Sequence, residues 1–351
     1  MILLPALLLA IPLAAIAQNP PAPPPAPGSA SPPPAASSPK GQQPVQDQTQ
    51  QPPLKVTSGL VHLVAAVSDR RHNFVTDLEK QDFKILEDGK PQTIQFFGRE
   101  TDLPLRIAML LDTSNSIRER LHFEKDAATD FLVNVIRRNK DMAFLMTFDN
   151  EPEIVQDYTG DTGMITEAIQ KQRAGGGTSL NDAIYMAAQK LGKAPLPAGT
   201  AQEVRRVLVV FSDGEDNLSD RALSDAIEMA ERSEVAVYSI STSTEWLATD
   251  TTDKPRKLFK TPGDKILEDL ATETGGRVFF PYKVDDLAVS FQDIGTELRS
   301  QYFIAYAPTN PMQSGQYRKI QVEVDRKGLV VRTRKGYYGV APAAGPYSNT
   351  Q

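Results

Sequence analysis

Strand-like and helix-like patterns alternate through the middle of this chain. Uninterrupted apolar runs at 107–111 and 207–211 are typical of strands that helices cover on both faces of a parallel sheet. Such patterns predict strands at 106–112, 142–148, 205–211, 234–241 and 277–281. Helical patterns predict helices near 117–138 and 161–172, and at 180–192, 219–232, 264–273 and 285–299. This alternation indicates right-handed crossovers and an α/β domain with a doubly wound, mainly parallel sheet over residues 102–300.

The segments on either side of this domain carry β patterns. Residues 59–67 alternate apolar and polar positions, and Asp88-Gly89 separates two further runs, which is a strong hairpin signal. Strand patterns return at 301–307, 317–324 and 328–334, and we expect a hairpin turn at 325–328. We therefore predict that an N-terminal β unit (54–101) and C-terminal strands (301–340) pair into a β-sandwich-like domain, into which the α/β domain is inserted.

The two ends of the chain have compositions of a different kind. Residues 1–17 are almost wholly apolar and end in Ala15-Ile16-Ala17 before Gln18, which predicts a cleaved signal peptide, with an uncleaved anchor as the alternative. The run is short for a membrane span, so no transmembrane span is expected in the mature chain. Residues 18–53 read as a Pro-rich disordered linker and 341–351 as a disordered tail. We expect an exported protein that is periplasmic, held at the cell surface or secreted.

Composition narrows the functional classes. The chain has 351 residues, of which 40% are hydrophobic, so a sizeable core is possible. The net charge of −6 argues against nucleic-acid binding, which needs a basic surface. There are no cysteines, so disulfides contribute nothing to stability after export. The oligomeric state is left open.

Candidate chemistry lies in three short segments. They contain Asp112-Thr-Ser114-Asn-Ser116, Gly-Gly-Gly-Thr178 and Ser-Asp213-Gly, and two of them directly follow predicted buried strands. Ligands of open α/β sheets bind beyond the carboxyl ends of the strands, so neighbouring strands would bring these oxygens together. Carboxylates and hydroxyls suit a hard cation, Mg²⁺ best, with Mn²⁺ or Ca²⁺ as alternatives. Each segment alone is also compatible with a helix N-cap or a turn.

These three motifs, in this order, resemble the metal-ion-dependent adhesion site of von Willebrand factor type A domains, and residues 103 to about 300 resemble that domain. The flanking β segments resemble an exported bacterial branch of the family. The resemblance implies that Ser114, Ser116 and Thr178 contact the metal directly or nearly so, whereas Asp112 and Asp213 act largely through water. It further implies divalent-cation-dependent protein–protein adhesion, in which the partner protein supplies an Asp or Glu carboxylate. Many members have Asp after the threonine, where this chain has Ser179.

Enzymatic and purely structural functions are the alternatives. The histidines are His62, His72 and His122, and neither a Gly-x-Ser-x-Gly elbow nor a P-loop motif is present. A Mg²⁺-dependent phosphoryl-transfer or hydrolytic enzyme that uses Asp112 is the stronger rival, although a serine stands where such an enzyme needs a general acid. A structural envelope scaffold is the third possibility. We expect a binding protein rather than an enzyme, and Trp246 is a candidate partner anchor at the rim of the site.

Overall fold

The computed structural model describes residues 59–99, 103–197, 204–243, 260–281, 284–310 and 315–339. The predicted signal peptide, the Pro-rich linker, the C-terminal tail and Trp246 lie outside these ranges. Within them, no helix is long and apolar enough to cross a membrane.

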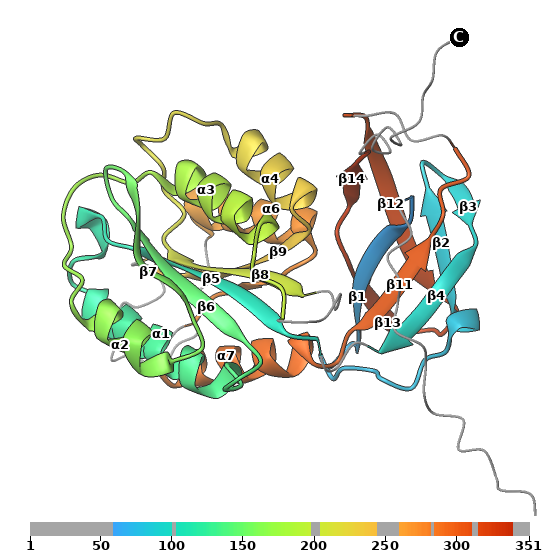
Figure 1. Cartoon of the computed structure of the whole chain (residues 1–351), viewed down its shortest axis with the longest axis horizontal. Coiled ribbons are helices and arrows are strands. Elements are labelled where there is room, and N and C mark those ends of the chain that lie inside the picture. Colours follow the sequence, from blue (N-terminus) through green and yellow to red (C-terminus); the bar gives the residue numbers. More distant parts are fainter. Residues whose placement is uncertain are drawn as a thin grey trace, which may run out of the picture. The chain divides into compact units, whose positions relative to one another are not determined.

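A six-stranded sheet forms the centre of the α/β region (Figure 1), in the order β10-β9-β8-β5-β6-β7. Its strands are β5 (Leu105–Asp112), β6 (Met142–Phe148), β7 (Pro152–Thr159), β8 (Arg205–Ser212), β9 (Val235–Ser241) and β10 (Val278–Phe279). All neighbours pair in parallel except β6 and β7, which are antiparallel. The predicted doubly wound, mainly parallel sheet is therefore confirmed. The sequence pattern missed β7, an edge strand without a long apolar run.

Helices cover both faces of this sheet. They are α1 (Leu121–Val135), α2 (Thr162–Gln170), α3 (Leu180–Gly192), α4 (Leu223–Arg232), α6 (Pro262–Thr274) and α7 (Val284–Leu298). Strand β5 is buried along its whole length, and its side chains alternate between two cores. Ile107, Met109 and Leu111 pack with α1, α2 and α7, whereas Ala108 and Leu110 pack with α3, α4 and α6 (Figure 1). An unbroken apolar run is what a strand covered on both faces requires.

Two four-stranded antiparallel sheets form the β region, in the orders β13-β1-β11-β4 and β14-β12-β2-β3. The N-terminal strands are β1 (Val61–Asp69), β2 (Phe83–Glu87), β3 (Lys90–Gln92) and β4 (Ile94–Arg99), with a 3₁₀ turn, η1, at Lys80–Asp82. The C-terminal strands are β11 (Tyr302–Tyr306), β12 (Tyr317–Val324), β13 (Leu329–Arg332) and β14 (Gly336–Tyr338). Pairing of β1 with β11 and of β2 with β12 joins the two ends of the chain, as the sequence predicted.

One of the two predicted turns is correct and the other is wrong. Asp88 (φ 48°) and Gly89 (φ 77°) connect β2 to β3 as a two-residue hairpin. Both φ angles are positive, as a type I′ turn requires, and Asp-Gly is a sequence that adopts them readily. The turn at 325–328 does not close a hairpin. Strand β12 pairs with β2 and β14 in one sheet, and β13 pairs with β1 in the other. Turn residues reverse the chain locally, but only the available sheet edges decide which partner the next strand meets.

A buried carboxylate connects the two sheets of the β region. Glu87 on β2 is 0% exposed. Its Oε1 accepts a hydrogen bond of 2.7 Å from Arg318, and its Oε2 accepts bonds from the hydroxyls of Tyr306 (2.7 Å) and Tyr337 (2.9 Å). Glu87 therefore has both a counter-charge and hydroxyl donors, which is the condition for burying a carboxylate without a large desolvation cost.

Candidate metal-binding site

The first and third motifs meet at the carboxyl ends of two adjacent strands. Strands β5 and β8 are hydrogen-bonded neighbours, with Leu111 opposite Phe211. Asp112 ends β5, and its Oδ2 accepts a 2.8 Å hydrogen bond from the hydroxyl of Ser212, the last residue of β8. Asp213 follows directly and is 8% exposed. The structure therefore brings both predicted carboxylates to one edge of the sheet.

The loop after β5 presents the two predicted serines. Asp112 Oδ1 accepts a 2.9 Å hydrogen bond from the backbone N–H of Ser114. The hydroxyls of Ser114 and Ser116 lie 3.0 Å apart, held by a short 3₁₀ turn, η2 (Asn115–Ile117), that precedes α1. Ser114 is buried, whereas Ser116 is exposed. Two hydroxyl oxygens thus face a common point, and that point is open to solvent on the side of Ser116.

The glycine-rich loop places Thr178 against the same edge. Gly175 donates a 2.8 Å backbone hydrogen bond to Thr113, and Asn115 donates one of 3.2 Å to Gly176. Gly176 has a φ of +77°, and a Cβ at Gly177 would press against the side chains of Leu218 and Asn217. Gly176 therefore needs glycine, whereas a larger residue at Gly177 would require these side chains to shift. All five residues predicted for the site lie at this edge of the sheet.

The loop after Asp213 fixes the position of Thr178, which the sequence analysis did not anticipate. Asn217 Oδ1 accepts the backbone N–H of Thr178 at 2.9 Å. The carbonyl of Thr178 in turn accepts the N–H groups of Asn217 and Leu218. Asp216 Oδ2 accepts the N–H of Asn181 at 2.8 Å and so caps the first turn of α3. Asp and Asn four and five residues after a strand are a usable capping signal, but here they act on α3 and on Thr178, which come earlier in the chain.

Burial and like charge act together on Asp112. Its side chain is 0% exposed, and burial raises its pKa to about 6, against hydrogen bonds from Ser114 and Ser212 that lower it and with Asp213 adding repulsion. A carboxyl that is buried beside a second carboxylate, with no cation to offset it, is typical of functional sites.

Glu124 on α1 is a third acidic group that the sequence did not reveal. It is 1% exposed, and neither carboxylate oxygen has a hydrogen-bond partner among the described residues. Burial, followed by the charge of Asp112, raises the pKa of Glu124 well above its usual value. A glutamate in the first turn of a helix is usually solvated, so its position in the sequence gave no signal.

These oxygen ligands suit a hard cation whose remaining coordination positions are filled by water or by an external ligand. The atoms that converge are carboxylate and hydroxyl oxygens, which Mg²⁺ and similar ions prefer. In the part of the chain that the structure describes, no three His, Asp or Glu side chains are grouped closely enough to hold a metal by themselves. A cation here would therefore depend on the hydroxyls, on water and on an external ligand.

The same geometry disfavours the enzymatic alternative. Asp112 is fully buried, and each of its carboxylate oxygens already accepts a hydrogen bond. A carboxylate that attacks phosphorus must reach its substrate, and the burial of Asp112 does not favour that role. His122 is exposed on α1 and pairs with Asp126 at 3.4 Å.

Comparison with known proteins gives a family match and several fold neighbours. Residues 107–215 match the family model of the von Willebrand factor type A domain. No curated protein matches the chain. Among solved structures, the chain is similar to a von Willebrand factor type A protein from Catenulispora acidiphila, with 12% identity, 82% of this chain and 75% of that chain covered, and a TM-score of 0.44.

Two further structures are similar over the central part of the chain. An aerotolerance-related membrane protein from Bacteroides fragilis shares 19% identity over 55% of this chain and 98% of its own, with a TM-score of 0.43. Proximal thread matrix protein 1 from the mussel byssus, solved with a zinc-occupied MIDAS motif, shares 16% identity, with 60% of this chain and 48% of that chain covered and a TM-score of 0.41.

Proposed function

We propose that the von Willebrand factor type A domain of this chain, matched over residues 107–215, binds a partner protein through a divalent cation. Domains of this family are in general interaction modules rather than enzymes. Asp112, Ser114, Ser116, Thr178 and Asp213 would hold the ion, and Mg²⁺ is the ion that their oxygens suit best. A carboxylate of the partner would complete its coordination.

The observation that carries this proposal is the convergence of acid groups with hydroxyls at one edge of the sheet, where the charge of Arg120 offsets only part of the repulsion on Glu124. Asp112, Asp213 and the buried Glu124 repel one another electrostatically. A bound divalent cation would remove that repulsion and supply the counter-charge. The only chemistry asked of the ion is Lewis acidity toward an anionic oxygen.

An acidic partner follows from the composition of the site. Three of the five predicted ligands are neutral hydroxyls, so the cation keeps an attraction for one more anion. Ser116 is exposed, which leaves the ion accessible from solvent. A partner's Asp or Glu would enter on that side, and a neutral amide would bind more weakly.

The test is a pull-down with the full chain as bait, from the native envelope fraction, in Mg²⁺ and in EDTA. We expect partner capture in Mg²⁺ that is lost in EDTA and lost in Asp213→Asn. Glu215→Gln, an exposed acid two residues away, is the matched control and should behave as the wild type. Equal capture with and without chelator would overturn the metal-dependent mechanism.

Export remains part of the proposal. A cleaved signal peptide over residues 1–17 would direct the chain to export, where the domain that follows the Pro-rich segment 18–53 could meet a partner. N-terminal sequencing of the mature protein should begin at Gln18, whereas a start at Met1 would support the anchor alternative.

A further inference from the structure

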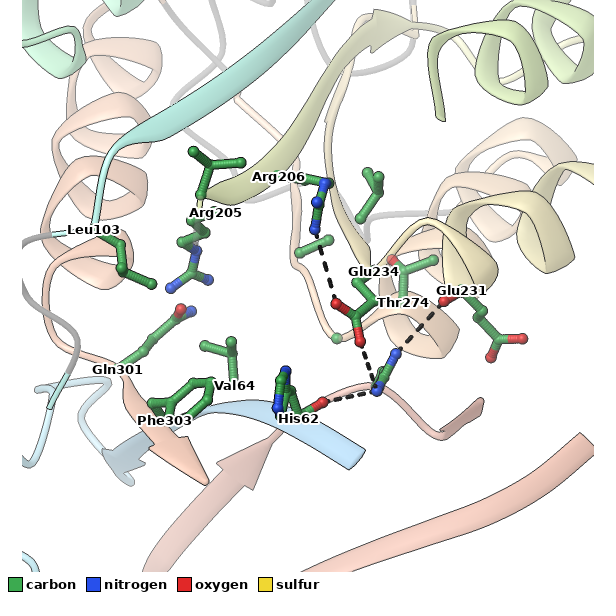
Figure 2. Close-up of a pocket in the computed structure, with 15 residues that line it drawn as sticks. His62, Val64, Leu103, Arg205, Arg206, Glu231, Glu234, Thr274, Gln301 and Phe303 are labelled. Atoms are coloured by element: carbon green, nitrogen blue, oxygen red, sulfur yellow. Dashed lines mark hydrogen bonds and ion pairs between the residues drawn. The ribbon is translucent and has the colours of Figure 1, made fainter. Parts of the chain in front are cut away.

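A second polar pocket lies at the opposite, amino edge of the central sheet. Its cavity volume is about 80 Å³, enough for a few water-sized groups. Its lining comes from the first residues of β8 and β9 and from strands β1 and β11 of the β region (Figure 2). All four strands belong to the same compact unit of the chain. Nothing in the proposed adhesion function uses this pocket.

Arg205, at the start of β8, is the unusual residue in the pocket. It is 7% exposed, and its Nε and Nη1 have no hydrogen-bond partner among the described residues. Figure 2 shows its guanidinium pointing toward Gln301 and the space between β8 and β11. In the part of the chain that the structure describes, Tyr238 is the one side chain that hydrogen-bonds this guanidinium, so two of its nitrogens remain buried without an acceptor, which is costly.

The acid that attracts Arg205 is engaged through one of its two carboxylate oxygens, and its Oε2 has no hydrogen-bond partner among the described residues. Glu297 on α7 is 0% exposed. It forms an ion pair with Arg332 and accepts a 2.7 Å hydrogen bond from Tyr238 and a 3.3 Å bond from Gln301. Its interaction with Arg205 is only a longer-range attraction. Arg205 therefore stays without a close counter-ion.

The other charged groups do not neutralise the pocket. Arg206 and Arg334 share one carboxylate, Glu234, at 3.8 Å and 3.5 Å. Glu231, the other acid in the lining, has a pKa that burial raises to about 7, so part of its population is neutral near neutral pH. Three guanidinium groups thus face little more than one full negative charge.

Part of the remaining lining is apolar. Val64 and Phe303 close the side of the pocket toward the β region, and Leu103 lies near the start of β5 (Figure 2). An inorganic anion would bind the guanidinium but would leave these surfaces unfilled. A ligand with one anionic end and a short hydrocarbon end matches both surfaces.

We propose that this pocket binds a small aliphatic carboxylate, with its carboxylate at Arg205 and its hydrocarbon chain against Val64 and Phe303. The ligand would contact β8 on one side and β1 and β11 on the other. It would therefore add contacts between the α/β and β regions that the protein alone lacks, and it would stabilise the folded chain.

The test uses the full chain in EDTA, with sodium butyrate as the probe and sodium chloride at equal ionic strength as the reference. We expect a saturable rise in the melting midpoint and saturable heat on calorimetric titration with butyrate. Arg205→Met should reduce the affinity at least 10-fold, while Arg326→Met, an exposed arginine outside the pocket, should bind as the wild type does. Val64→Phe, which fills the cavity and keeps the guanidinium, should also abolish binding, so the test holds even if Arg205→Met fails to fold.

Two results would overturn the proposal. One is a response to butyrate that does not saturate, or that is equal in the wild type and Val64→Phe, since it would be a general salt effect. The other is tighter binding of inorganic phosphate than of butyrate, since the apolar walls would then play no part. EDTA keeps the adhesion site free of divalent cations, so neither result bears on the metal-dependent function.

Discussion

The carboxylates of Glu87 and Asp112 are equally buried, but the charged residues near them have opposite signs. Both are 0% exposed. Glu87 accepts hydrogen bonds from the guanidinium of Arg318 and from two tyrosine hydroxyls. Asp112 receives one hydroxyl and one backbone N–H, and its nearest charged neighbours include Asp213 and Glu124.

This difference supports a structural role for Glu87 and the proposed metal-binding role for Asp112. A buried carboxylate that is paired with an arginine and with tyrosine hydroxyls, as Glu87 is, joins two sheets and needs no further counter-charge. A buried carboxylate among other carboxylates destabilises the fold until a cation arrives. Burial alone therefore does not identify a binding site, and the sign of the neighbouring charge does.

The largest effect is expected when Glu87 loses its carboxylate. Glu87→Ala removes the counter-charge of the buried Arg318 and the acceptor of two tyrosine hydroxyls, which should lower the free energy of unfolding by about 3–5 kcal/mol. Urea denaturation followed by circular dichroism measures this change. Glu323→Ala, an exposed acid on β12, is the control and should change stability by less than about 0.5 kcal/mol. A similar small loss for Glu87→Ala would mean that the buried ion pair contributes little.

In EDTA, Asp112→Asn should raise the free energy of unfolding, whereas Glu87→Ala lowers it. Because burial and Asp213 raise the pKa of Asp112 to about 6, its stabilising contribution is present at acidic pH and is lost as pH rises through about 6. Near neutral pH the neutral amide should therefore raise the free energy of unfolding by about 1–3 kcal/mol.

Addition of Mg²⁺ should reverse the order of stability of the wild type and Asp112→Asn. At about 100 times the dissociation constant, Mg²⁺ should stabilise the wild type by about 2.7 kcal/mol and leave Asp112→Asn unchanged. Thermal melts in EDTA and in Mg²⁺ test both halves of the prediction. An equal response to Mg²⁺ in the two proteins would remove Asp112 from the metal site.

Asn217→Ala tests the loop that positions Thr178. Loss of the 2.9 Å bond to the N–H of Thr178 should weaken Mg²⁺ binding about 10–100-fold, as for other residues that orient metal ligands. Calorimetric titration with Mg²⁺ measures the affinity. Asn134→Ala, an exposed asparagine on α1, should bind Mg²⁺ as the wild type does. Unchanged affinity in Asn217→Ala would show that Thr178 keeps its place without this bond.

The surroundings of the Glu231 carboxylate are intermediate between those of Glu87 and Asp112. Burial raises its pKa to about 7, and a single 3.2 Å hydrogen bond from Tyr317 opposes that shift. Its stabilising contribution should be complete below about pH 4.5 and lost as pH rises through about 7, a change of about 1–2 kcal/mol. Glu231→Gln should flatten this part of the stability profile, measured by urea denaturation at about pH 5 and about pH 8. Glu119→Gln should leave the profile as it is.

Local patterns were sufficient to predict the strands that carry the site. The runs before Asp112 and Asp213 are unbroken because both faces of their strands are covered, so strand and loop could be located from the chain alone. The residues that complete the site were different. Glu124 and Asn217 matter only because α1 and the 214–221 loop return to the same edge of the sheet.

In the β region, too, local sequence patterns predicted turns but did not decide which strands pair. Asp88-Gly89 specifies its hairpin because those two residues favour the positive φ angles that the turn needs. The turn at 325–328 is equally turn-like, yet the next strand joins the other sheet. No local preference distinguishes these outcomes, since they depend on which strand edge lies within reach.

By itself, the sequence determined the alternation of strands and helices and the place of the three motifs along the chain. Those properties follow from side-chain periodicity and turn chemistry, which act over a few residues. Only the tertiary structure decided which charges become neighbours: Arg318 beside Glu87, Asp213 and Glu124 near Asp112, and no close carboxylate beside Arg205. The electrostatic environment of a buried group is set by residues far apart in the chain, so the groupings on which the proposed cation site and the proposed anion pocket depend arise only on folding.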